Sequence, residues 1–145
     1  MDRVIAQAVA AETLRRVAEK LNLRGVGGAL IAEKWDFTLY PTLVFVGDLW
    51  PDPDLVEYKG GDHTAGALSK LAEMLSTWVD SGSPQIIGTT RESRGGLTRV
   101  IGGRLCLFTF FDGGTPDQNV EVALAALNIL NDVFNAYLPE HLFSE

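Results

Sequence analysis

Residues 96–111 read GLTRVIGGRLCLFTFF, and this stretch decides the fold class. Two apolar runs flank Gly102 and Gly103, a dipeptide that tolerates the positive φ angles of a tight hairpin turn. Positions 105–110 are apolar on nearly every residue, so both faces of the second strand should be covered. The stretch therefore predicts a β-hairpin whose second arm lies in the centre of an antiparallel sheet.

Downstream of the hairpin, the sequence predicts a long helix that begins at Thr115 and ends before Pro139. Thr115 followed three residues later by Gln118 is a capping-box pattern, and Pro116 occupies the first helical position. Its apolar residues form two stripes, Val120, Leu124, Leu127, Leu130 and Phe134, and Val122, Ala126, Ile129, Val133 and Tyr137. One stripe can cover the sheet, and the second predicts a homo-oligomer formed through this C-terminal helix.

Upstream, helical spacing of apolar residues predicts one helix from about residue 5 to 21 and another that Asp62 or Thr64 caps. The apolar face expected for the second helix consists of Leu68, Leu71, Leu75, Trp78 and Val79. Short apolar runs predict further strands at 25–33, 39–48 and 85–90. The order is helix, two strands, helix, three strands, helix, which predicts an α/β (α+β) domain over residues 1–145. We expect a central antiparallel sheet of about five strands with helices packed on its faces, the order found in profilin-like domains.

The composition and charge limit the classes of partner that the protein is expected to bind. The 145 residues are 46% hydrophobic and 21% charged, as in ordinary globular proteins. A net charge of −7 argues against nucleic acid and anionic membranes. No apolar run approaches the ~18 residues of a membrane span, and no signal peptide opens the chain. The single cysteine, Cys106, excludes an internal disulfide, and its mid-strand position predicts an inert thiol. We expect a cytoplasmic protein.

The junction GGTPDQNVEVALAAL at 113–127 resembles the C-terminal signature of the haem-binding GlcG/HbpS-like family, a domain also found in some PduO proteins. The matching residues are Gly113, Gly114, Thr115, Gln118, Asn119, Glu121, Ala123 and Ala126. The segment YKGGDHTAGAL at 58–68 lies where that family has a helix bearing a lysine and a Thr-Ala pair. The resemblance implies a small oligomeric protein that binds haem, or another planar or corrinoid-pathway ligand; some members are described as haem-degrading.

Two groups of residues are candidates for the ligand site. At Gly113, Gly114, Thr115 and Gln118, the free N–H groups of a helix start could bind a carboxylate such as a haem propionate. A structural interpretation stays open, in which the glycines permit a sharp turn and Thr115 caps the helix. In the second group, His63 is the candidate metal ligand to haem iron, and Lys59 could pair with a propionate beside Thr64. Aromatic residues that could line a flat-ligand pocket or an interface are Trp35, Phe37, Tyr40, Phe45, Trp50 and Tyr58.

Other interpretations remain. The order of elements, together with ALSKLAEMLSTW and GGLTRVIGGRLCLFTFFDGG, also resembles roadblock-type domains, which implies a dimeric scaffold or GTPase regulator without chemistry. A third hypothesis is a small enzyme with a cleft at a subunit boundary, but no catalytic constellation is visible, so we expect binding rather than catalysis. Residues 89–96, TTRESRGG, lack a phosphate-loop pattern, although Arg91 or Arg94 could meet an acidic group.

Overall fold

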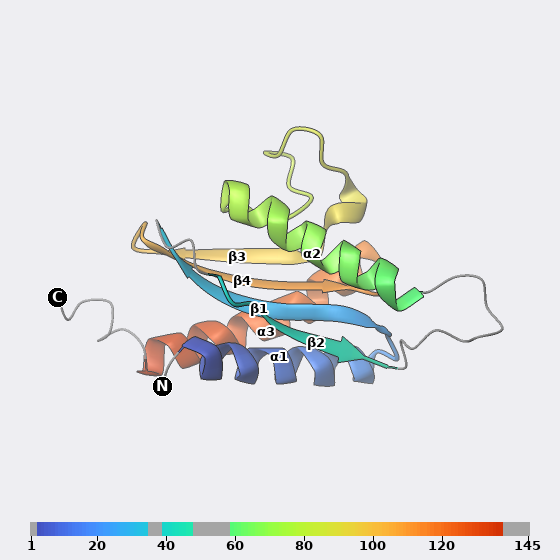
Figure 1. Ribbon diagram of the computed structural model, residues 1–145, viewed down its shortest axis with the longest axis horizontal. Helices are drawn as coiled ribbons and strands as arrows, with labels where there is room; N and C mark the ends of the chain where they lie inside the picture. Colours follow the sequence, from blue (N-terminus) through green and yellow to red (C-terminus); the bar gives the residue numbers. More distant parts are fainter. Residues whose placement is uncertain (1–2, 35–38, 48–58, 138–145) are drawn as a thin grey trace.

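The computed structural model describes residues 3–34, 39–47 and 59–137, with only the backbone helix described for 59–62 and 137. These ranges contain three α-helices and four β-strands (Figure 1). The elements are α1 (Arg3–Lys20), β1 (Gly25–Glu33), β2 (Thr42–Val46), α2 (Lys59–Thr77), the 3-10 turn η1 (Arg91–Ser93), β3 (Gly96–Ile101), β4 (Leu105–Asp112) and α3 (Pro116–Tyr137).

The strands form one antiparallel sheet in the order β2-β1-β4-β3, so β1 and β4 lie at its centre. The turn between β3 and β4 contains Gly102 and Gly103 at φ angles of +61° and +70°, the left-handed conformation that the dipeptide predicts. Every residue from Leu105 to Phe111 is buried. The predictions of a hairpin, a buried central strand and an antiparallel sheet flanked by helices are confirmed.

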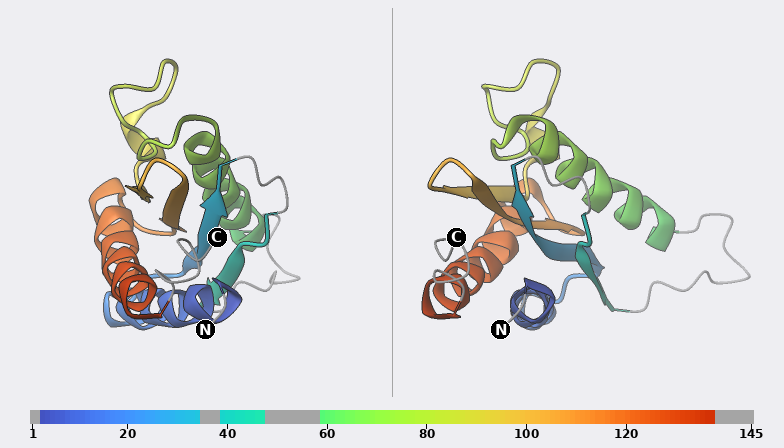
Figure 2. Two further views of the ribbon diagram at one scale, coloured as in Figure 1. Left: turned by 90° about the vertical axis from the view of Figure 1, so that its left-hand side faces the viewer. Right: turned by 60° about the vertical axis from the view of Figure 1, so that its left-hand side comes forward.

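The helices divide unequally between the two faces of the sheet (Figure 2). Helices α1 and α3 pack against each other and cover one face, where Leu107 and Phe111 of β4 contribute to the core. Of the three described helices, only α2 covers the other face, over Cys106, Phe108 and Phe110. Successive residues of β4 therefore serve two separate hydrophobic cores, as the alternation of a strand requires.

A fifth strand at 85–90 is the prediction that the structure does not confirm, because this segment consists of turns and extended coil. The outer edge of β3 is already hydrogen-bonded by the residues that follow α2. Asp80 Oδ1 accepts from Thr98 N at 2.8 Å, and Ser81 N donates to Gly96 O at 3.0 Å. A fifth strand would need these positions, and Pro84 together with the positive φ of Gly88 interrupts the segment further.

Helix α2 begins at Lys59, before the expected caps Asp62 and Thr64, so the predicted start is wrong. The predicted apolar face is confirmed in part, because Leu71 is buried and Leu75 and Trp78 pack against the same core. Ala67, Lys70, Leu71 and Met74 are buried, whereas Leu68 is exposed, and Trp78 and Val79 lie beyond the helix end. The buried lysine, placed in the middle of an apolar stripe, shows that a polar contact helps to fix which face turns inward.

On α3, residues of both predicted apolar stripes pack into the hydrophobic cores of this chain. Val122 and Ala126 of the second stripe are buried in a core that includes Leu14 and Ala18 of α1. The first stripe is mixed, since Leu130 is buried but Leu124 is exposed. Burial of Val122 and Ala126 under α1 uses part of the surface from which an oligomer was inferred, and oligomerisation through α3 stays a prediction.

Candidate functional site

Asp112 is the last residue of β4, and its carboxylate lies where the end of this strand meets helix α2. Its carboxylate accepts hydrogen bonds from two residues of α2 on separate oxygens. Lys70 Nζ lies 2.5 Å from Oδ1, and His63 Nδ1 lies 3.1 Å from Oδ2. The Lys70 side chain is only 4% exposed, whereas those of His63 and Asp112 are 29% and 25% exposed. The cluster thus has a buried end at the lysine and an open end at the imidazole.

The contact with Asp112 defines the tautomer of His63. A carboxylate only accepts hydrogen bonds, so the imidazole must carry its hydrogen atom on Nδ1. In the neutral ring the lone pair then lies on Nε2, which has no hydrogen-bond partner among the described residues. A histidine held by a carboxylate in this way is oriented to coordinate a metal or to accept a proton through Nε2.

Gly66 permits the close approach of α2 to the carboxylate. A Cβ added at Gly66 would lie 2.6 Å from both Cγ and Oδ2 of Asp112. Gly66 is separated from His63 by three positions and from Lys70 by four, so all three lie on one side of the helix. The glycine leaves the space that the carboxylate occupies between its two partners.

The start of α3, the other predicted site, is closed by its own side chains. Thr115 Oγ1 accepts from Gln118 N at 3.2 Å, and Gln118 Oε1 accepts from Thr115 N at 2.9 Å. Asn119 adds to this cap, because its Oδ1 accepts from Gly114 N at 2.8 Å and its own N–H donates to Thr115 O. The capping box is confirmed. These N–H groups are not free for an anion, which leaves Gly113, Gly114, Thr115 and Gln118 as ligand residues on the resemblance alone.

The glycine pair before α3 has a packing role. A Cβ at Gly113 would lie 2.1 Å from the carbonyl oxygen of Arg24, where the end of β4 passes the start of β1. At Gly114 a Cβ would meet the Gln118 side chain at 2.8 Å. The structural interpretation of this junction accounts for both glycines without a ligand.

The remaining predicted site residues are only partly described. Lys59 begins α2, but its side chain lies outside the described part of the chain, and Thr64 is half-buried on the same helix. Among the aromatic residues, Tyr40 and Phe45 are exposed. Trp35, Phe37, Trp50 and Tyr58 lie outside the described residues. Of the residues predicted in this second group, His63 has a defined polar contact, to Asp112.

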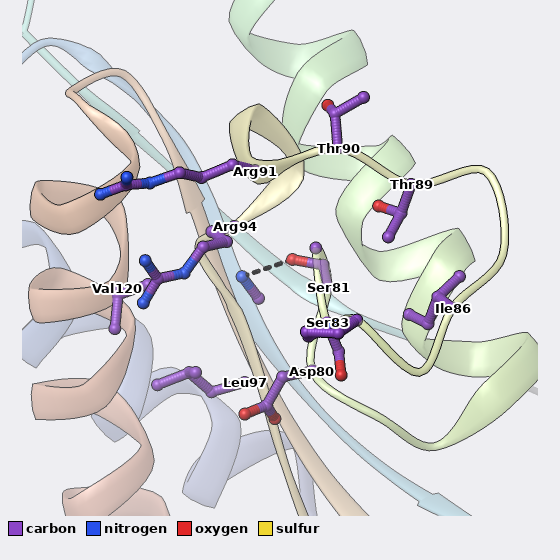
Figure 3. Close-up of a pocket in the computed structure, with 13 residues that line it drawn as sticks. Asp80, Ser81, Ser83, Ile86, Thr89, Thr90, Arg91, Arg94, Leu97 and Val120 are labelled. Carbon is purple, nitrogen blue, oxygen red and sulfur yellow. Dashed lines mark hydrogen bonds between the residues drawn. The ribbon is translucent and has the colours of Figure 1, made fainter.

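A hollow of about 900 Å³ lies elsewhere, beside the loop that follows α2 (Figure 3). Its walls come from residues 80–97 and from Val120 of α3. None of the seven residues predicted to bind a ligand lines it. The hollow and the Asp112 cluster are distinct features of the described structure.

Cys106 carries no sign of reactivity. Burial in the sheet raises the pKa of its thiol to about 12, so the thiolate needed for nucleophilic attack is absent at neutral pH. The described residues also do not gather three or more His, Cys, Asp or Glu side chains that could hold a metal ion. None of the helices in the described ranges combines the length with the apolar character that a bilayer span requires.

Sequence reasoning missed both Lys70 and Asp112 as residues of the site. One local signal exists, since Lys70 stands at helical spacing between the apolar residues Ala67 and Met74. A lysine in an apolar stripe indicates a buried partner. The identity of that partner, 42 positions away, has no local signal.

Compared with family models, curated proteins and solved structures, the chain matches none of them. The resemblances to the GlcG/HbpS-like family and to roadblock-type domains therefore stand on the residues that carry them.

Proposed function

We propose that the protein is a small ligand-binding protein that holds haem, or a similar planar metal-bearing group, through His63. The observation that carries the proposal is the hydrogen bond between His63 Nδ1 and Asp112 Oδ2. Histidine ligands of metals usually donate their other ring N–H to a carboxylate or carbonyl, which fixes the ring and makes the coordinating nitrogen more basic. His63 meets this requirement with a partly exposed side chain.

Lys70 completes the arrangement from the buried side. Its ammonium group pairs with Oδ1 of Asp112, so the carboxylate is held even when no ligand is present. With Asp112 neutralised by Lys70, a neutral imidazole needs no further counter-charge. In the neutral tautomer that Asp112 selects, the Nε2 lone pair is available to an iron centre. When bound, haem would supply an iron atom that His63 Nε2 could coordinate.

The test is a titration of the purified protein with haemin, followed by the Soret band. We expect a saturable shift that His63→Ala abolishes. The control is His141→Ala, because His141 is the other of the two histidines in the sequence. Asp112→Asn should retain the imidazole but weaken binding by about 10-fold, the lower end of the effect of losing such an orienting group.

Two results would contradict the proposal. One is a Soret band that never saturates with the wild-type chain, and the other is an unchanged spectrum in His63→Ala. Circular dichroism of each apoprotein variant separates a lost ligand from a lost fold.

We further propose a profilin-like, homo-oligomeric assembly of this domain. The division of helices, two on one face and one on the other, supports the architecture. Exposed apolar side chains on the α1 and α3 layer, among them Val4, Val9 and Leu124, support self-association. Light scattering after size-exclusion chromatography measures the mass, and a monomer at tens of micromolar would refute the assembly. The same result would weaken the alternative of a roadblock-type dimer.

A further inference from the structure

Charged and polar side chains line part of the hollow beside the loop after α2, and they have no part in the proposed function. On one side, η1 and the residue after it bring Arg91 and Arg94 together, and both point toward the start of α3 (Figure 3). On another side, the loop carries Thr89 and Ile86. Leu97 and Val120 form an apolar part of the wall.

We propose that this hollow binds a small organic anion, with one carboxylate or phosphate group on an apolar body, through Arg91 and Arg94. Planar guanidinium groups bind either head group through paired hydrogen bonds. A volume of about 900 Å³ suits an organic molecule rather than a bare ion.

The two arginines share one carboxylate, that of Asp117 at the start of α3. Arg94 Nη1 lies 3.2 Å from Oδ1, and Arg91 Nη2 lies 3.5 Å from Oδ2. The Asp117 side chain is 71% exposed, and an ion pair so open to water contributes little to stability. An incoming anion can therefore displace Asp117 from the guanidinium groups at little cost.

The acidic residues of the wall limit the charge of the ligand. Asp80 lines the hollow, and its Oδ1 accepts from both N and Oγ1 of Thr98. With Asp80 and Asp117 present, the local charge favours one anionic group rather than several. The net charge of −7 also opposes unspecific binding of anions, so measurable affinity requires a local site.

The experiment is an NMR titration of the ¹⁵N-labelled full chain with phenyl phosphate and with benzoate, using phenol as the neutral control. Saturable shifts confined to residues 81–97 and 117–120 are expected with at least one anion, and the tighter of the two identifies the head group. Arg94→Gln should weaken binding at least about tenfold, as expected for loss of a charge-assisted hydrogen bond. Asp117→Asn should strengthen it several-fold, because the competing carboxylate is removed.

Arg104→Gln is the matched control, since Arg104 is an exposed arginine in the turn at the far end of β3. It should leave the affinity unchanged, and so should His63→Ala, which separates this site from the haem proposal. Equal shifts with phenol and the anions would overturn the proposal, as would unchanged affinity in Arg94→Gln or weaker binding in Asp117→Asn. If Arg94→Gln does not fold, Arg91→Gln tests the same wall, and full affinity in that variant would overturn the proposal.

Discussion

At the scale of single residues, Asp112 determines how α2 meets the sheet. One carboxylate accepts a hydrogen bond from Lys70 on one oxygen and from His63 on the other. Lys70 is buried, and a buried ammonium group without a partner is strongly unfavourable. Lys70 therefore draws α2 toward the end of β4, and the same contact places His63 at the surface with a defined tautomer.

Cys106 provides a prediction about pH. Burial raises the pKa of its thiol to about 12 in the folded protein, from about 9 in the unfolded chain. Between these values the unfolded chain releases the proton while the folded protein keeps it. The stability that protonated Cys106 contributes is therefore fully present below pH 9 and is lost as pH rises toward 12. We expect the free energy of unfolding to fall over pH 9–10.5 more steeply in the wild type than in Cys106→Ala.

Urea unfolding at pH 7, 8, 9, 10 and 10.5, with a reductant present, measures this difference. Below pH 8.5 the gap between the two proteins should be constant and reflect only the lost packing. A gap that stays the same up to pH 10.5 would show that the thiol ionises alike in both states.

At the scale of elements, the sequence predicted well wherever a local pattern determines the structure. The hairpin, β1 and the cap of α3 depend on glycine positions, short apolar runs and a capping box, each within a few residues. The strand expected at 85–90 also has a suitable local pattern. It fails because Asp80 and Ser81 already bind the edge of β3, a contact across 15 to 18 positions.

The face of α2 illustrates the same limit. Hydrophobicity favoured burial of Leu68, but Leu68 is exposed and Lys70 is buried. The pairing of Lys70 with Asp112, and the space left by Gly66, can be recognised only once α2 and β4 are placed together. For the candidate site, His63 was predicted, whereas the carboxylate that orients it depends on a contact across 49 positions.

Gly66→Ala tests the contact between α2 and β4. In an exposed helix position this change would stabilise the protein by about 1 kcal/mol, because alanine is the better helix former. Here the new Cβ would lie 2.6 Å from Cγ and Oδ2 of Asp112, a short side chain held by two partners. Overpacking of this kind costs about 1–3 kcal/mol. We expect a net loss of about 1 kcal/mol in the free energy of unfolding.

Ser69→Ala is the control for Gly66→Ala, since Ser69 lies exposed on the same helix and gains only from helix propensity. Thermal and urea unfolding of both variants give the comparison. If Gly66→Ala proves as stabilising as the control or more so, Asp112 does not occupy the position beside Gly66.

At the scale of the whole molecule, the two faces of the sheet have unequal cover. Helices α1 and α3 pack on each other as well as on the sheet, and together they enclose side chains such as Leu14 and Val122. Among the described helices, α2 has no neighbour on its face of the sheet (Figure 2). Its described attachment consists of one apolar core and the Asp112 cluster. The molecule thus contains a double layer and a single, separately anchored helix.

Local stability should follow this division, because segments with fewer buried contacts open without unfolding the rest. We expect amide hydrogen exchange to be slowest in β1 and β4, intermediate in α1 and α3, and fastest among the long elements in α2. Lys70→Met removes the buried anchor and leaves Asp112 with one partner, so exchange in α2 should rise by about tenfold or more. Lys20→Met, at the exposed end of α1, is the control. If Lys70→Met instead raises exchange equally in all three helices, α2 opens only with the whole molecule, and its face of the sheet is as firmly held as the other.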